Sequence, residues 1–478
     1  MSELPNWLQN LLPIVILLAV IGLVLWRLPK VELGHSQAFK TRRGFNWVPL
    51  GLTYAFLYFG RYNINEATSA LKGTSNDDFG TIFGVGAAVY GVSFLINGPL
   101  TDKLGGRKTI LIAALGAATA NAVLGLITWA MLAHDWMPPG GVVVTFATIY
   151  AANMYFQSFG AVSIVKVNAH WFHVRERGVL GGVFGVLISL GVYFAYDWSA
   201  AIAAALPTYW VFFIPAAVLA LFFVIDLFVI RDTPSHAGFA DFDTADASSG
   251  ETGPPLGVVQ VFTKMITNPI IIVILSVEFC SGFLRNAIMQ WGRKYAVQTG
   301  FAEDSFVFGN WGLVLCVAGI LGGMFAGVIS DRVFGSRRGP VSAVLYGAMT
   351  LGAIATSFAL GSPALGWLVA FMSLCVIGVH GMLSGTASMD FGGKNNAGVA
   401  VGIIDGAVYA GTAFQSILLG KLLPRGEAAA DPANWSNWPL AMIPLALIGF
   451  LLATRIWNSK PQGAPAPAIV PTPEVKAG

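Results

Sequence analysis

Charged residues are scarce in this sequence. Asp, Glu, Lys and Arg together make up 11% of its 478 residues, while 55% of the residues are hydrophobic. Soluble domains usually carry about 25% charged residues, so a soluble globular protein is excluded. The formal net charge is only +3, and the basic residues lie in short loops between apolar runs. They indicate an orientation in a lipid bilayer and exclude a nucleic-acid surface.

Cysteine is also rare, and the sequence lacks the motifs of soluble catalysis. The three cysteines fall within apolar runs, with no CxxC and no metal-ligand spacing, which excludes a disulfide framework and a metal site. There is no Walker A loop, so an ATP-driven pump finds no support. One Ser/His/Asp cluster lies in an acidic stretch without a scaffold around it. We therefore expect no enzyme, no cofactor and no metal.

Long apolar runs are what the sequence has instead. A membrane-spanning helix needs about 20 mostly apolar residues, and the sequence predicts thirteen such helices. The first, near 8–28, lacks the positive region and the small-residue cleavage site of a signal peptide, so we expect it to be retained. The other twelve are predicted near 46–69, 79–101, 109–134, 141–168, 177–205, 208–230, 266–297, 305–330, 340–360, 364–389, 396–422 and 436–456.

The basic loop residues predict the orientation, because Lys and Arg concentrate on the cytoplasmic side of membrane proteins. If the first helix starts outside, the basic loops all fall on one side. They contain Arg27, Lys30, Lys40, Arg42, Arg43, Lys103, Arg107, Lys108, Lys166, Arg175, Arg177, Arg332, Arg337 and Arg338. The expected protein crosses the cell inner (plasma) membrane many times, with its N-terminus outside and its C-terminus in the cytoplasm.

One long polar stretch divides the chain. Residues 231–264 are acidic, rich in Gly, Ser and Asp, and have no apolar period, which is typical of a linker. We therefore expect an extra N-terminal transmembrane helix with a basic connection over 1–44, and a six-helix bundle over 45–230. The cytoplasmic linker over 231–264, a second six-helix bundle over 265–457 and a disordered cytoplasmic tail over 458–478 follow.

An internal repeat supports this division. GPLTDKLGGRK (98–108) follows the second helix of the first bundle, and GVISDRVFGSRR (327–338) follows the second helix of the second. Each places an Asp (Asp102, Asp331) at a helix end and a basic residue (Arg107, Arg337) after a glycine turn. The Asp can pair with a cation or cap a helix, and the glycine permits close helix contact. We interpret this cytoplasmic motif mainly as a topological hinge.

The paired motifs, the six-plus-six arrangement and the central linker resemble the major facilitator superfamily, in which two pseudo-symmetric bundles rock around a midplane site. The resemblance covers residues from about 45 to 457. Within that superfamily the chain looks like the organophosphate:phosphate antiporters, which include glycerol-3-phosphate and hexose-6-phosphate transporters. Four stretches carry this match: YAFLYFGRYN, RNAIMQWGRKY, SDRVFGSRRG and GVAVGIIDGAVYAG. The resemblance implies an all-α integral membrane protein with the major facilitator fold.

Two arginines lie deep inside predicted spanning helices, at matching places in the two halves: Arg61 and Arg285. A cation near the bilayer centre costs at least about 2.5–3.5 kcal/mol, so it must face water, a partner or an anionic ligand. Guanidinium is a planar donor fork that suits phosphate oxygens. The resemblance implies that the pair binds phosphate. The alternative is an ion pair with Glu66, five residues after Arg61, or Glu278, seven residues before Arg285.

Aromatic residues accompany these arginines. Tyr54 and Tyr58 share one helical face with Arg61, and the resemblance implies that they line the cavity together with Tyr409. Trp291 is a further substrate-binding candidate. Aromatic packing between helices is the alternative for all four residues.

The chain departs from the glycerol-3-phosphate transporters at two positions. Phe94 stands where those proteins have a lysine, and Ile188 stands where they have a histidine, so the cavity is less basic. The candidates for coupling or gating are Glu278, Asp405 and Glu66. Other polar residues in the spans that can tune specificity are Asn97, Asn153, Gln157, Asp226, Asn310, His380 and Gln415.

The sequence thus predicts a monomeric secondary active transporter that moves an organophosphate or related organic anion by alternating access, in exchange for inorganic phosphate. Two alternatives stay open. One is a membrane sensor of a sugar phosphate, and the other is a proton-coupled symporter of a carboxylate or sulfonate.

Overall fold

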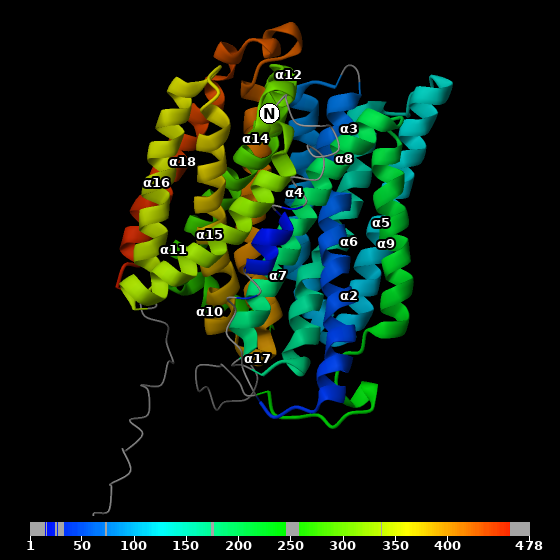
Figure 1. Ribbon diagram of the computed structural model, residues 1–478, viewed down its shortest axis with the longest axis vertical. Coiled ribbons are helices and arrows are strands. Elements are labelled where there is room, and N and C mark those ends of the chain that lie inside the picture. The colour runs from blue at the N-terminus through cyan, green and yellow to red at the C-terminus, as the bar shows by residue number, and fades with distance from the viewer. Residues whose placement is uncertain are drawn as a thin grey trace, which may run out of the picture.

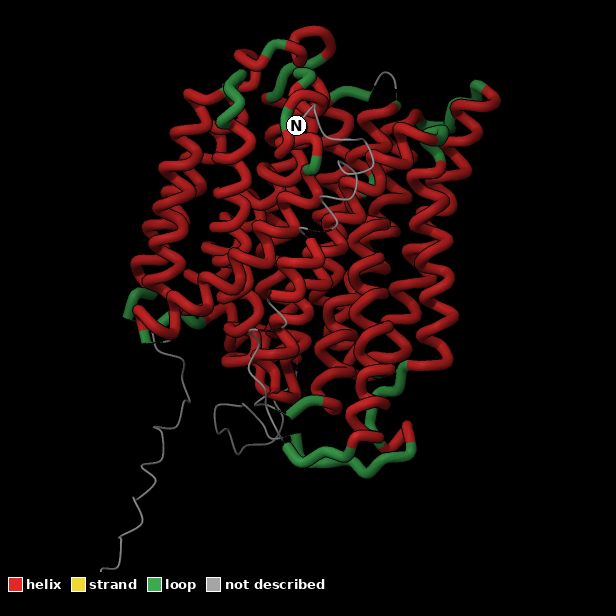
Figure 2. Tube along the Cα trace, in the orientation of Figure 1, coloured by secondary structure: helices red, strands yellow, loops and turns green. Residues whose placement is uncertain are grey.

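The computed structural model describes residues 15, 17–23, 26, 33–71, 74–173, 176–244, 258–335 and 337–458. Over these residues the chain forms helices and no strand. Figure 1 shows the helices of the first half of the chain mainly on the right and those of the second half mainly on the left, with the long helices roughly parallel to the long axis. Figure 2 shows the connections gathered at the two ends of the molecule. The predicted all-α fold of two packed bundles is confirmed.

The first bundle combines long helices with two short ones at their ends. Its elements are α2 (Gln37–Tyr62), α3 (Ile64–Ala70), α4 (Asn76–Leu104), α5 (Gly106–His134), α6 (Gly141–Trp171), α7 (Arg177–Tyr193), the π-helix η2 (Phe194–Trp198), α8 (Ser199–Ala205) and α9 (Trp210–Val229). Ser75 and Asp78 form a capping box at the start of α4. Gly105 joins α4 to α5 at a φ of 87°, a conformation that favours glycine.

The second bundle follows the short helix η3 (Ser235–Ala237). Its elements are α10 (Val258–Thr267), α11 (Pro269–Asn286), the π-helix η4 (Ala287–Trp291), α12 (Gly292–Gln298), α13 (Phe301–Asp304), α14 (Phe306–Gly309), α15 (Trp311–Phe334), α16 (Arg338–Ala359), α17 (Leu365–Leu422), η5 (Gly426–Ala430), η6 (Pro432–Trp435) and α18 (Asn437–Arg455). Part of the expected linker is therefore helical, because 258–264 belong to α10. This helix lies against α11 and α17; Met265 is buried, while Val259, Phe262 and Ile266 are exposed.

The long helix α17 reverses direction. Near its start, Gly366 lies against Val307 and Phe308, and near its end Gly420 lies against Asn76 and Gly80 at the start of α4. Both ends of α17 thus lie at the same end of the molecule. The two legs, 365–383 and 402–422, each qualify separately as a membrane span, in agreement with the two predicted helices in this region.

Ten helices among the described residues are long and apolar enough to cross a membrane. The remaining long helices, α2 and α6, contain 26 and 31 residues and carry several buried polar side chains, which lower their hydropathy. Together, the ten candidate spans and the helices α2 and α6 correspond in number to the twelve spans predicted for the two bundles. The predicted helix near 8–28 lies mostly outside the described residues, but Leu17 is buried in one cluster with Phe59 and Leu313.

The two ends of the molecule differ in charge. We call the end that carries Arg107, Arg231 and Arg337 the basic end, where α4 meets α5, α9 ends and α15 meets α16. The opposite end carries Glu66, in the first turn of α3, and Asp77, in the first turn of α4. The candidate site lies between them, where α2 and α11 contribute their arginines.

Candidate functional site

Arg61 lies on the last turn of α2 and is completely buried. Its three guanidinium nitrogens donate hydrogen bonds to residues of three other helices. Nε donates to Oε1 of Gln157 (2.8 Å), Nη1 to the hydroxyl of Tyr409 (2.9 Å) and Nη2 to the hydroxyl of Tyr90 (2.8 Å). The guanidinium also lies over the rings of Tyr58 (4.5 Å) and Tyr90 (4.4 Å). These partners are all neutral, so they fix the guanidinium without cancelling its charge.

Arg285 comes from the other bundle, one residue before the end of α11, and is 8% exposed. Its guanidinium carbon lies 5.8 Å from the ring centre of Tyr409. Its Nε is buried and has no hydrogen-bond partner among the described residues. Asp405 lies close enough to act on Arg285 electrostatically. Tyr409 is therefore the residue at which both arginines meet, with its hydroxyl on Arg61 and its ring near Arg285.

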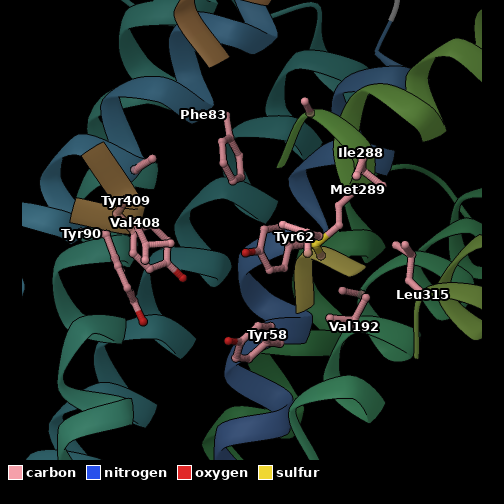
Figure 3. Packing of buried hydrophobic residues seen from close by; sticks show 14 of the residues in the cluster. Tyr58, Tyr62, Phe83, Tyr90, Val192, Ile288, Met289, Leu315, Val408 and Tyr409 are labelled. Atoms are coloured by element: carbon pink, nitrogen blue, oxygen red, sulfur yellow. The ribbon is translucent and has the colours of Figure 1, made fainter. Parts of the chain in front are cut away.

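A cluster of tyrosines surrounds this meeting point. Figure 3 shows Tyr58 and Tyr62 on α2 facing Tyr90 on α4 and Tyr409 on α17. The ring centres of Tyr90 and Tyr409 are 4.2 Å apart, and those of Tyr58 and Tyr62 are 5.8 Å apart. Tyr54 packs edge-on against Tyr58 at 5.4 Å, so it meets the cluster through Tyr58. Such a cluster offers several hydroxyl groups and aromatic faces beside the two cations.

Trp291 lies in a different layer from the arginines. It is fully buried in η4 and packs edge-on against Phe79 of α4 at 5.4 Å between ring centres. The structure therefore brings Trp291 into the packing between the bundles on the side of the opposite end. Phe94, by contrast, lies in the tyrosine cluster, 4.7 Å from Tyr90 between ring centres. Phe94 thus places an aromatic ring close to the arginines, at the position where the sequence comparison expected a lysine in glycerol-3-phosphate transporters.

The alternative of an ion pair between Arg61 and Glu66 is wrong. Glu66 binds Arg293 of α12 through two hydrogen bonds, at 2.8 Å and 3.1 Å. The reason is the five-residue spacing, which places the two side chains about 140° apart around a helix, and Asn63 between them keeps helical dihedral angles. Arg293 itself was not among the predicted site residues, although it follows Arg285 by two turns.

The Glu66–Arg293 pair is one of several bonds that join the two bundles at the opposite end. Lys294 donates to the hydroxyls of Thr68 (3.4 Å) and Ser69 (3.2 Å). The carboxylate of Asp197 in η2 accepts hydrogen bonds from the first amides of α15, at 2.6 Å from Gly312 and 2.9 Å from Leu313. A carboxylate at a helix N-terminus is favourable because of the helix dipole. These contacts hold the bundles together on the side of the opposite end.

Glu278 pairs with a histidine and not with Arg285. Its side chain is fully buried, and Oε2 lies 3.0 Å from Nδ1 of His380 on the first leg of α17. Oε1 has no hydrogen-bond partner among the described residues. Asp405 lies on the second leg of α17, four residues before Tyr409, so the two share one helical face. Glu278, His380 and Asp405 therefore form an ionisable group of residues beside Arg285.

The repeated motif at the basic end makes local contacts. Asp102 pairs with Lys166 of α6 at 2.9 Å. The backbone amide of Arg107 donates to Asp232, and its guanidinium donates to the carbonyl of Leu227 at 2.6 Å. Nε of Arg337 donates to the carbonyl of Phe334 at 3.0 Å, and the side chain of Asp331 lies outside the described residues. These contacts fix the ends of helices, as a hinge requires.

Two residues of the cluster were missed in the sequence. Tyr90 and Tyr62 both lie next to Arg61, but only Tyr62 belongs to the quoted stretch YAFLYFGRYN, where it follows Arg61 directly; Tyr90 lies outside the four stretches that carry the resemblance. Tyr90 carried a usable signal, because it precedes Phe94 by four residues and so lies on the same face of α4. Gln157 was named among the polar residues of the spans, and its contact with Arg61 gives it a definite place.

Comparison with known proteins agrees with this architecture. The sequence profile of the Major Facilitator Superfamily matches residues 50–416. The glycerol-3-phosphate transporter of Bacillus subtilis (strain 168) is 25% identical over 451 residues, covering 89% of this chain and 94% of that protein. The membrane sensor protein UhpC of Escherichia coli (strain K12) is 24% identical over 444 residues, covering 86% and 91%.

A second type of relative and a solved structure complete the comparison. A probable hexose phosphate transport protein of Chlamydia trachomatis serovar D is 24% identical over 447 residues, covering 86% of this chain and 90% of that protein. The crystal structure of a bacterial homologue of the human lysosomal transporter Spinster, inward-facing and unoccupied, has a TM-score of 0.67 at 14% identity, covering 88% and 98%. That likeness shows the fold. The predicted resemblance to the glycerol-3-phosphate and hexose-phosphate transporters is confirmed.

Proposed function

Because this chain belongs to the Major Facilitator Superfamily, we propose that it is a transporter of a phosphate ester or related organic anion. It works by alternating access and exchanges its substrate for inorganic phosphate. The observation that carries the proposal is the contact of Arg61 and Arg285, one from each bundle, with the same tyrosine, Tyr409. Relatives named as transporters of glycerol-3-phosphate and hexose phosphate support the substrate class.

The chemistry of the two arginines favours an anion with two charges. Each guanidinium is fixed by neutral groups or is only partly bonded, so positive charge is available to a ligand. A unit charge about 4 Å from a guanidinium gains about 4 kcal/mol at an effective dielectric constant of about 20. A phosphate group carries about −1.5 to −2 charges at neutral pH and can accept hydrogen bonds from both forks. It therefore draws the two bundles toward each other.

Exchange follows from the same electrostatics. In the empty protein the two cations repel each other, which opposes the approach of the bundles that reorientation requires. A bound anion removes the repulsion, so the loaded carrier reorients and the empty one does not. We propose that the basic end faces the cytoplasm, that the N-terminus lies outside and that one chain is sufficient. The contacts at the opposite end then describe a carrier closed toward the outside.

The test is phosphate exchange in proteoliposomes. The protein is reconstituted with internal inorganic phosphate, and uptake of labelled phosphate is measured. Arg285→Lys keeps the charge but loses the planar fork, and we expect it to abolish exchange. Arg425→Lys is the matched control, because Arg425 is an exposed partner of Asp77 at the opposite end, and exchange should persist. Full exchange by the Arg285→Lys protein would contradict the proposal, and saturable binding without exchange would favour a sensor.

A second candidate function is proton-coupled symport of an organic anion, and the buried Glu278–His380 pair favours it. Glu278 lies two helical turns before Arg285. A proton bound by the Glu278–His380 pair therefore changes the charge near the substrate. His380→Gln keeps a hydrogen-bonding side chain but cannot titrate. If the pair carries the coupling proton, uptake driven by an acid outside medium is lost in His380→Gln while phosphate exchange persists. Identical pH profiles for both proteins would exclude this role of the pair.

A further inference from the structure

A second cationic site lies at the basic end, away from the tyrosine cluster. A depression of about 470 Å³ separates the start of α2 from the end of α9, and it is lined by Arg42, Phe45, Phe228, Val229, Arg231, His236 and Ala237. Arg42 precedes Arg61 by 19 residues on the same helix. At 1.5 Å per residue the two arginines are roughly 28 Å apart. The depression is therefore separate from the candidate transport site.

The two arginines of this depression are held in place by uncharged groups. Nη2 of Arg42 donates to the carbonyl of Val229 (2.8 Å), and its guanidinium lies over the ring of Trp171 at 5.6 Å. Nη1 of Arg231 donates to the carbonyl of Ile230 at 2.8 Å. The backbone of Arg231 is fixed by Asn46, which accepts from its amide at 2.7 Å. The two guanidinium groups lie near enough to repel each other.

The neighbouring carboxylates are engaged elsewhere. Asp232, the next residue in the chain, accepts a hydrogen bond from the backbone amide of Arg107 at 2.8 Å. Asp226, one turn earlier in α9, accepts from the hydroxyl of Thr53 at 2.6 Å. Within the described part of the chain neither guanidinium is bonded to a carboxylate, and two like charges held side by side provide a site for an anion with more than one oxygen.

Apolar groups border the cations on the outer surface. The side chains of Phe45 and Phe228 are 65% and 70% exposed. Phe228 is the last residue but one of the membrane-spanning helix α9, so it lies where the hydrocarbon region gives way to the polar surface. Exposed phenylalanines at this depth face acyl chains, and arginines beside them face headgroups. Cationic groups beside an exposed apolar surface are complementary to the charged headgroup and the acyl chains of an anionic phospholipid.

We propose that this depression binds an anionic phospholipid in the leaflet at the basic end. Arg42 and Arg231 bind its phosphate oxygens, and Phe45 and Phe228 pack against the upper part of its acyl chains. The lipid bridges the first and the last helix of the first bundle. Basic pockets between transmembrane helices bind anionic headgroups in this manner. The proposal does not depend on the identity of the transported substrate.

The test measures which lipids the purified full-length protein retains. The protein is exchanged into detergent with equal amounts of phosphatidylglycerol and phosphatidylcholine, and bound lipids are counted by native mass spectrometry. Wild type should retain phosphatidylglycerol in preference to phosphatidylcholine. Arg42→Gln/Arg231→Gln should weaken retention of phosphatidylglycerol at least about tenfold, since each basic residue contributes about 1 kcal/mol to binding of anionic lipid. Arg425→Gln, an exposed arginine at the opposite end, should leave retention unchanged.

Additional variants and a titration with inorganic phosphate separate loss of lipid binding from loss of folding and from binding of a free anion. If the double variant does not fold, Arg42→Lys/Arg231→Lys keeps both charges and should still retain phosphatidylglycerol, while Phe228→Gln alone should weaken it. Equal retention of both lipids by wild type would overturn the proposal. In the last arm, inorganic phosphate is added to delipidated protein. Thermal stabilisation by phosphate that is lost in the double variant, without any preference for phosphatidylglycerol, would assign the site to a free anion and also overturn the proposal.

Discussion

Replacing Arg61 by lysine keeps the positive charge but removes the planar fork that reaches three helices. The guanidinium donates to Gln157, Tyr409 and Tyr90 at 2.8–2.9 Å, whereas a lysine amino group is a single point that cannot reach all three acceptors. A hydrogen bond to a charged group contributes about 1.5–3 kcal/mol. Loss of one such bond to bound phosphate lowers affinity about 10- to 150-fold.

The assay is binding of inorganic phosphate to purified protein by calorimetry, followed by exchange in proteoliposomes. Arg61→Lys should fold, because the positive charge stays among the same tyrosines. Its melting temperature, compared with that of the wild type, shows whether it is folded. Arg425→Lys controls for a general loss of arginine. A folded Arg61→Lys protein that binds phosphate within twofold of wild type would refute the reasoning, since the fork would then have no part in binding.

Two further predictions concern the packing of the bundles. Glu66→Gln leaves Arg293 without its carboxylate at a site where the two side chains are 6% and 12% exposed, and breaking a buried pair costs about 3–5 kcal/mol. We expect faster amide hydrogen exchange along α3 and α12, reversed by the charge swap Glu66→Arg/Arg293→Glu; unchanged exchange would show that the pair does not hold this end closed. Gly282→Ala places a Cβ into the backbone of α17 and should abolish expression of folded protein. Gly185→Ala, which meets nothing within 4 Å, should fold normally, and a stable Gly282→Ala protein would contradict the close helix contact.

Local pattern was enough to locate the spans and the two buried arginines. The apolar runs fixed which segments cross the bilayer, because the length of a spanning helix is set by the bilayer thickness. A cation within such an apolar run indicates a partner or a ligand, because an unpaired charge in the bilayer is costly. The paired motifs then indicated the superfamily, and the profile match over 50–416 confirmed it. The helical part of the expected linker was missed because α10 has only 10 residues, too few to be recognised as a membrane span.

The partners of the charged residues depended on the tertiary structure. The sequence interpretation left Glu66 as a partner for Arg61, but residues five apart lie on different faces of a helix, and Glu66 instead binds Arg293 of the other bundle. A seven-residue spacing, about two helical turns, left Glu278 available to Arg285, but the carboxylate of Glu278 pairs with a histidine 102 residues away.

Sequence alone therefore determined the membrane setting, the two-bundle architecture and the pair of buried cations, since these follow from hydropathy and from residues close together in the chain. Tertiary structure decided that both arginines meet at Tyr409 and that Gln157 and Tyr90 orient one of them. The physical reason is that helix periodicity says which residues share a face, but not which faces meet. That choice is made by the packing of helices distant in the chain, and π-helical turns such as η2 and η4 shift the register on which a prediction from spacing relies.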